Sequence, residues 1–221
     1  MNQIIQFRGV IIKESQVGES DKYLTLLTKD RGKVTVRARG AKNAKSKFLT
    51  AQMFSYADFI VFQGGVKASG FLSLTQVELI ESFYDLRLDY DRLMVAYDLA
   101  KIIDRYLVGT LEDTIEPHES AAILWLVLKS LKTLAKGVID SALVHPIFCL
   151  KFLQIVGLSP YVEKNVVYTA HDSIPVKENV GYTLSYILEK PVKDVYAFHV
   201  TADILSPLSE LCQVLLRSLE I

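Results

Sequence analysis

Residues 33–39 read Lys-Val-Thr-Val-Arg-Ala-Arg, and this alternation is the clearest structural signal in the chain. Successive side chains of a β-strand point to opposite faces, so the apolar side chains share one face and the polar ones share the other. We therefore predict a strand whose apolar face points into a core. Its outer face carries Lys33, Thr35, Arg37 and Arg39.

Other stretches before residue 81 alternate in the same way, and glycines separate them. Because glycine favours turns, we place strands near 7–13, 21–28, 33–39, 53–62 and 70–79. Five short strands in about eighty residues are best accommodated by a small closed barrel. The OB-fold and the SH3-like barrel both fit this count, and periodicity alone does not separate them.

The periodicity changes after residue 84. Apolar residues at spacings of three and four over 84–100 predict an amphipathic helix, and the almost uniformly apolar run 121–128 predicts a buried one. We place a third helix from Pro146 to Gly157 and a last one from Ser206-Pro207 to Arg217, because proline favours helix starts and glycine favours ends. Residues 158–205 have no clean period.

The sequence thus predicts an α+β protein with two domains, a five-stranded barrel over 1–81 and a mainly α-helical domain over 82–221. Charge divides near the same boundary, with a net charge of +6 over 1–80 and −6 over 81–221, although the whole chain is neutral. A basic domain joined to an acidic one is typical of a protein whose basic part meets a polyanion.

Half of the 221 residues are apolar, which is enough to form a substantial core. We find no secretory signal at the N-terminus, and the apolar stretch 121–134 is shorter than the ~20 residues that span a bilayer. Cys149 and Cys212 lie in apolar helical contexts, where free thiols are usual. We therefore expect a cytoplasmic protein with no membrane association.

Basic residues concentrate around the strand at 33–39. Between positions 29 and 47 there are eight lysines and arginines and one acidic residue. A strand face and loop of this kind suit a phosphate backbone, which gives salt-dependent binding. The alternative is a solvated face that confers solubility and protects a sheet edge. The predicted contacts are Arg31, Lys33, Arg37, Arg39, Lys42, Lys45 and Lys47.

Aromatic residues can add base stacking to such a surface. Phe48 lies within the basic loop and is our candidate for a stacking residue. Phe54, Tyr56 and Phe62 share one strand face, and we expect them to fill the barrel interior, because small barrels need large side chains there.

Catalytic and metal-binding patterns are missing from the sequence. The four histidines are scattered, the glycine pair at 64–65 is not followed by the Lys-Ser/Thr of a phosphate-binding loop, and the two cysteines are far apart. The carboxylate pair Asp89/Asp91 fits a solvated helix face better than acid–base chemistry. We expect a protein that is not an enzyme.

Residues 18–46, GESDKYLTLLTKDRGKVTVRARGAKNAKS, closely resemble the N-terminal signature of the bacterial RecO family. The resemblance continues through 74–83, LTQVELIESF, and returns at 152–160, FLQIVGLSP, which is similar to the helix leading into the family's C-terminal module.

The resemblance implies an N-terminal OB-fold, a helical C-terminal domain and no enzymatic active site. It also implies binding to single- and double-stranded DNA, annealing of complementary strands, and action with RecR and the C-terminal tail of single-strand-binding protein to help load RecA. The expected DNA contacts are then the basic residues of the matched segment, Lys33, Arg37, Arg39, Lys42, Lys45 and Lys47.

One feature departs from the family pattern. Many members carry a four-cysteine zinc module after the element that matches 157–160, whereas this chain has Asn165 and Tyr168 roughly where the first cysteine pair would stand. No cysteine occurs between 150 and 211. We therefore predict no structural zinc and no other cofactor.

Two other classes of protein fit the same residues. An RNA-binding barrel would use the same basic face, and a preference for structured RNA would identify it. A protein-interaction adaptor would bind its partner through the helical domain and use the basic strand only for solubility. An enzyme has the least support, because no nucleophile, base and orienting group occur together.

Overall fold

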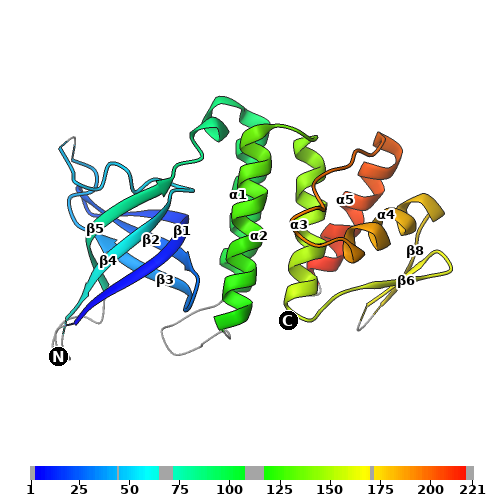
Figure 1. Cartoon of the computed structure of the whole chain (residues 1–221), viewed down its shortest axis with the longest axis horizontal. Coiled ribbons are helices and arrows are strands. Elements are labelled where there is room, and N and C mark those ends of the chain that lie inside the picture. Colours follow the sequence, from blue (N-terminus) through cyan, green and yellow to red (C-terminus); the bar gives the residue numbers. More distant parts are fainter. Residues whose placement is uncertain (1–2, 44, 65–71, 108–116, 170–171, 218–221) are drawn as a thin grey trace. The chain divides into compact units, whose positions relative to one another are not determined.

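The computed structural model describes residues 3–43, 45–64, 72–107, 117–169 and 172–217. The chain forms two compact units. The first consists of Met1–Tyr84 and Ala100–Leu124, and the second of Asp85–Leu99 and Trp125–Ile221. Figure 1 shows the strands of the barrel in the first unit and the helices that follow it along the chain.

The barrel contains five strands, β1 (Gln3–Val17), β2 (Asp21–Thr28), β3 (Gly32–Ala38), β4 (Tyr56–Gln63) and β5 (Leu72–Glu81). They close in the order β1-β2-β3-β5-β4. β3 and β5 run parallel, and the other neighbouring pairs are antiparallel. This is the OB-fold topology, so the predicted α+β class is confirmed and the SH3-like alternative is excluded.

β1 belongs to both sides of the barrel, because its first half pairs with β4 and its second half with β2. The exchange of partners takes place around Gly9, which is paired with Thr28 on one side and Ala57 on the other. A Cβ atom at this position would collide with the carbonyl oxygen of Leu27. Only glycine therefore fits where β1 crosses between its two neighbours.

The inner face of β4 is formed by three fully buried residues, Ala57, Phe59 and Val61. Phe62 is 37% exposed and Tyr56 is half-buried, so the prediction that they fill the barrel is wrong; Phe54 is buried. Phe54 has a left-handed backbone conformation with a φ of 70°. The strand therefore begins after it, and Phe54 does not share the alternation of β4.

The helices are α1 (Tyr90–Tyr106), preceded by a short 3₁₀ helix η1 (Tyr84–Leu88), then α2 (Pro117–Lys136), α3 (Ser141–Ile155), α4 (Glu178–Glu189) and α5 (Ala202–Arg217). α3 and α5 begin before the predicted prolines, Pro146 and Pro207. Asp140 starts α3, because its side chain accepts a hydrogen bond from the Ala142 backbone N–H at 2.9 Å. Each proline then costs its helix a single internal hydrogen bond.

α3 lies at the centre of the second unit, where it packs against α4 and α5. The segment without a clean period contains α4 and a small antiparallel sheet, whose strands are β6 (Tyr161–Glu163), β7 (Val166–Tyr168) and β8 (Ser173–Pro175). Such three-residue strands are too short to show an alternating pattern, which explains why the sequence did not predict them.

Candidate nucleic-acid interface

The strand β3 has the predicted alternation. Val34, Val36 and Ala38 are buried in the barrel core, and the four polar residues Lys33, Thr35, Arg37 and Arg39 lie on its outer side. Thr35 and Arg39 are exposed, but Lys33 and Arg37 are partly buried. The reason is that a carboxylate from another element holds each of these two cations.

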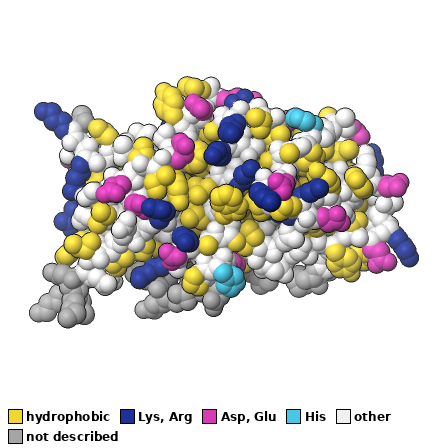
Figure 2. Space-filling model, viewed as in Figure 1, with side chains coloured by type: hydrophobic (Ala, Val, Ile, Leu, Met, Phe, Trp, Pro, Cys, Tyr) yellow, Lys and Arg dark blue, Asp and Glu magenta, His cyan; other side chains and the backbone are white. Residues whose placement is uncertain are grey.

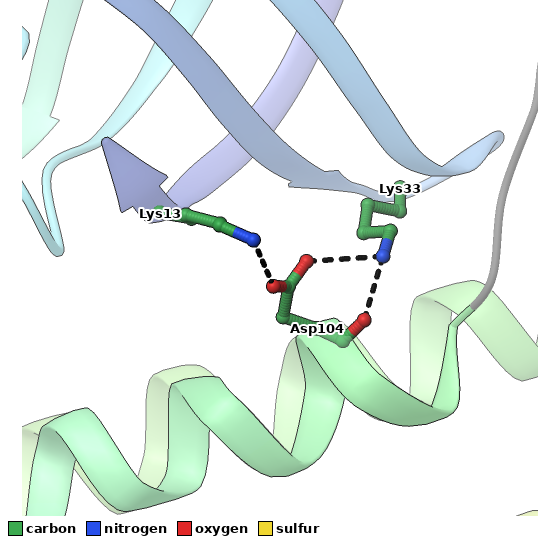
Figure 3. Close-up of polar contacts among 3 residues, drawn as sticks. All are labelled: Lys13, Lys33 and Asp104. Carbon is green, nitrogen blue, oxygen red and sulfur yellow. Dashed lines mark hydrogen bonds and ion pairs between the residues drawn. The ribbon is translucent and has the colours of Figure 1, made fainter. Parts of the chain in front are cut away.

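Lys33 is held by Asp104, near the end of α1 (Figure 3). Its ammonium group donates to the Asp104 carboxylate at 3.0 Å and to the Asp104 backbone carbonyl at 2.6 Å. Lys13 of β1 donates to the same carboxylate at 2.6 Å. Burial alone would raise the pKa of the Asp104 carboxyl, but the hydrogen bonds from the two lysines outweigh it and lower the pKa. The carboxyl therefore stays charged and binds both lysines.

Arg37 is held by Asp21 at the start of β2. Its guanidinium group donates twice to one Asp21 oxygen, at 3.0 and 2.8 Å. The other oxygen of Asp21 accepts a hydrogen bond from the Gly40 backbone N–H at 2.8 Å. The bonds from Gly40 and Arg37 lower the pKa of the Asp21 carboxyl. One carboxylate thus neutralises a strand cation and fixes the point where the following loop leaves β3.

The loop after β3 folds back on itself through backbone hydrogen bonds. Lys42 N–H donates to the Ser20 carbonyl at 3.0 Å, and Asn43 N–H donates to the Gly40 carbonyl at 3.1 Å. Ser46 N–H then donates to the Asn43 carbonyl at 2.9 Å. The loop is therefore anchored next to the β1–β2 turn, at one end of the barrel.

Phe48 is the second anchor of this loop. It is 3% exposed and belongs to the barrel core cluster, together with Ala51 from the same loop. The expectation of an exposed stacking ring at Phe48 is therefore wrong, because the barrel interior needs a large side chain at this end. Lys47 lies over the ring, with its ammonium nitrogen 5.2 Å from the ring centroid. Phe48 thus places the neighbouring lysines at the surface.

Four exposed cations remain at this end of the barrel, and we call them the basic loop: Arg39, Lys42, Lys45 and Lys47. Within the described part of the chain, none of them forms an ion pair, although Lys42 donates to the Gln16 side chain at 3.2 Å. Figure 2 shows lysine and arginine side chains projecting along the outer edge of the barrel.

Arg31 lies away from the basic loop, in the turn that joins β2 to β3. It is exposed, and its guanidinium carbon lies 5.7 Å from the centroid of the Phe7 ring. The six residue steps from Lys33 to Arg39 along β3 correspond to about 20 Å. The predicted set of contacts is therefore divided between two ends of the barrel, with Lys33 and Arg37 already paired between them.

The described residues contain no cluster of three or more histidine, cysteine or acidic residues that could hold a metal ion. No helix among these residues is long and apolar enough to cross a membrane. The site where the family's first zinc-binding cysteines would stand is the β6–β7 hairpin. There Tyr161 stacks on Tyr168 with ring centroids 5.0 Å apart, and Lys164 and Asn165 form the turn with positive φ angles.

Residues 1–83 match the family model described as "Recombination protein O N terminal". The DNA repair protein RecO of Bacillus subtilis (strain 168) is 34% identical over 186 residues, which cover 82% of this chain and 68% of that protein. This chain belongs to the RecO family. The DNA repair protein RecO of Acetivibrio thermocellus is 25% identical over 230 residues, covering 93% of this chain and 87% of the relative.

Sequence reasoning missed the two acidic residues that organise this RecO-family barrel, Asp21 and Asp104. Asp21 lies in the segment that resembles the family signature, but alternation along one strand does not reveal a partner on another. Asp104 is 71 positions from Lys33 in the sequence. No local pattern in the chain indicates that contact.

Proposed function

We propose that this RecO-family protein is a non-catalytic DNA-binding protein of repair and recombination, and that the basic loop holds single-stranded DNA. The observation that carries the proposal is the group of four exposed cations with no ion pair among the described residues. Because Asp21 and Phe48 anchor the loop, little conformational entropy is lost when a phosphate backbone binds to it.

The basic loop suits strand annealing. Its cations neutralise phosphates, which reduces the repulsion between two approaching strands. The ring of Phe48 is buried, so within the loop the contacts are to the backbone and not to base faces. Bases held in this way keep their pairing edges free for a complementary strand.

We further propose, from the family resemblance, that the protein acts with RecR and with the C-terminal tail of single-strand-binding protein to help load RecA onto single strands. Double-stranded DNA is a second ligand on the same grounds. The partner interaction is tested by binding assays with single-strand-binding protein with and without its tail. Equal binding of the two forms would contradict a role for the tail.

The DNA proposal is tested by fluorescence anisotropy with a labelled single strand of about thirty nucleotides at several salt concentrations. The loop variant Lys42→Ala/Lys45→Ala/Lys47→Ala removes three cations from the basic loop. The control variant Lys177→Ala/Lys193→Ala/Arg217→Ala removes three exposed cations from the second unit. Each single-strand phosphate contact contributes about 0.7 to the slope of log K against log salt, so the loop variant is expected to lose about 2 from the slope.

The control variant is expected to keep the wild-type affinity and slope. Equal losses in the two variants would show that overall charge, and not the basic loop, determines binding. A strong preference for structured RNA would favour an RNA-binding protein. The absence of nucleic-acid binding at low salt would contradict the proposal and favour a protein-interaction adaptor.

A further inference from the structure

The outer face of α2 carries a tryptophan followed by three lysines, Trp125, Lys129, Lys132 and Lys136, which we call the α2 stripe. Their spacings of four, three and four residues place them on one face of the helix. They extend over eleven residue steps, or about 16 Å along the helix axis. All four residues belong to the second unit.

The α2 stripe is open to solvent. Trp125 is 55% exposed, Lys132 and Lys136 are exposed, and Lys129 is half-buried. Among the described residues, none of the three lysines forms an ion pair. Figure 2 shows hydrophobic and basic side chains next to each other in the region where α1 and α2 overlap in this view.

The packing of α2 explains neither the exposed tryptophan nor the row of lysines. The core of α2 is supplied by other positions, including Leu126, Val127, Leu131 and Leu134, all of which are buried. The indole ring of Trp125 is therefore not part of this buried set, and leaving more than half of its surface in water is unfavourable. The three lysines, which have no ion pair among the described residues, also share one face, although residues 81–221 carry a net charge of −6.

We propose that the α2 stripe is a second contact surface for single-stranded DNA, in which Trp125 stacks on a base and the three lysines bind consecutive backbone phosphates. An exposed aromatic ring beside a row of cations is the combination that binds single strands without regard to sequence. The stripe joins one aromatic residue to three cations, so charge complementarity selects a polyanion with ring faces. This inference rests on the proposed DNA-binding function.

The stripe differs from the basic loop in the part of the nucleotide that it binds. The loop contacts phosphates alone, whereas the stripe adds a base through Trp125.

Trp125 is the only tryptophan in the chain, so its intrinsic fluorescence reports on this surface alone. Titration of the full chain with an unlabelled oligothymidylate of about thirty nucleotides is expected to quench the emission saturably, and added salt should reverse the change. Anisotropy measured with a labelled strand in parallel follows total binding. Trp125→Ala is expected to weaken binding about fivefold or more, since stacking contributes about 1–3 kcal/mol per base.

Lys129→Ala/Lys132→Ala/Lys136→Ala is expected to lower the salt slope by about 2, while the control variant Lys177→Ala/Lys193→Ala/Arg217→Ala leaves it unchanged. These lysines are not in the core, so the variants are expected to fold, and circular dichroism checks this. Trp125→Phe keeps an aromatic face and should retain most of the affinity.

Two results would overturn the inference and leave the proposed function intact. One is tight DNA binding that leaves the Trp125 emission unchanged, together with wild-type affinity in Trp125→Ala and in the triple lysine variant. The other is equal quenching by polyglutamate, which would identify the stripe as a docking site for an acidic protein segment. A complete absence of DNA binding at low salt overturns both proposals.

Discussion

Lys33→Met is expected to destabilise the first unit without weakening DNA binding. The Lys33 side chain is 14% exposed and donates two hydrogen bonds to Asp104, one to the carboxylate and one to the last turn of α1. Hydrogen bonds that involve a charged group contribute about 1.5–3 kcal/mol, and methionine retains the aliphatic contacts. We therefore expect the free energy of unfolding to fall by about 2 kcal/mol.

Lys13→Met is the matched control, because Lys13 bonds to the same carboxylate at 2.6 Å but is 54% exposed. Exposed ion pairs contribute at most about 1 kcal/mol, so this variant should lose less stability. Urea unfolding followed by circular dichroism measures both losses, and anisotropy measures DNA affinity. If Lys33→Met were as stable as the wild type but bound DNA more weakly than Lys13→Met, Lys33 would be a DNA contact and its pairing with Asp104 incidental.

Three other outcomes follow from buried or paired groups. Phe48→Ala is expected to cost the barrel about 3–5 kcal/mol in urea unfolding and Phe48→Leu much less, and an equally small loss for both would place Phe48 outside the core. The hydrogen bonds from Gly40 and Arg37 lower the pKa of Asp21, so the stability that its carboxylate contributes is present above pH ~4 and is lost as the pH falls through the lowered pKa. Asp21→Asn should reduce this acid sensitivity when unfolding is measured from pH 2 to 6. Burial lowers the pKa of Lys151, so the stability of the wild type should rise as the pH increases from this lowered pKa toward ~10.4, and Lys151→Met should abolish the rise. The same variant should change the stability at pH 7 by less than ~1 kcal/mol; a larger loss would mean that the hydrogen bonds from Lys151 to the Leu188 carbonyl and the Gln154 side chain dominate.

The sequence predicts the strands, helices and buried faces that depend on local periodicity. β2 and β3 lie where alternation places them, and α2 covers the apolar run 121–128; α1 covers 90–100 of the predicted helix over 84–100, whose first five residues form η1. The residues that line the β3 interior were predicted correctly, because a strand in a closed barrel has one buried face. The choice between the OB-fold and the SH3-like barrel required the pairing of β3 with β5, which periodicity does not contain.

The sequence did not predict the features that depend on distant residues. The lysines beside Phe48 favour a surface position for its ring, but the loop turns inward at Phe48 to fill the end of the barrel. Pro146 favours a helix start at its own position, but the capping side chain of Asp140 begins the helix earlier. In both cases a single tertiary or capping contact outweighs the local pattern.

The cations of the barrel fall into two groups, those of β3 that are paired with carboxylates and those of the basic loop that are not, and substitutions in the two groups are expected to have different effects. Asp21 and Asp104 neutralise the cations of β3, so that strand contributes a rigid frame and little net attraction for phosphates. The basic loop has no such partners among the described residues, and its attraction is therefore undiminished. Removing loop lysines should change affinity with little effect on folding, whereas changing the strand cations or their carboxylates should alter the frame that positions the loop.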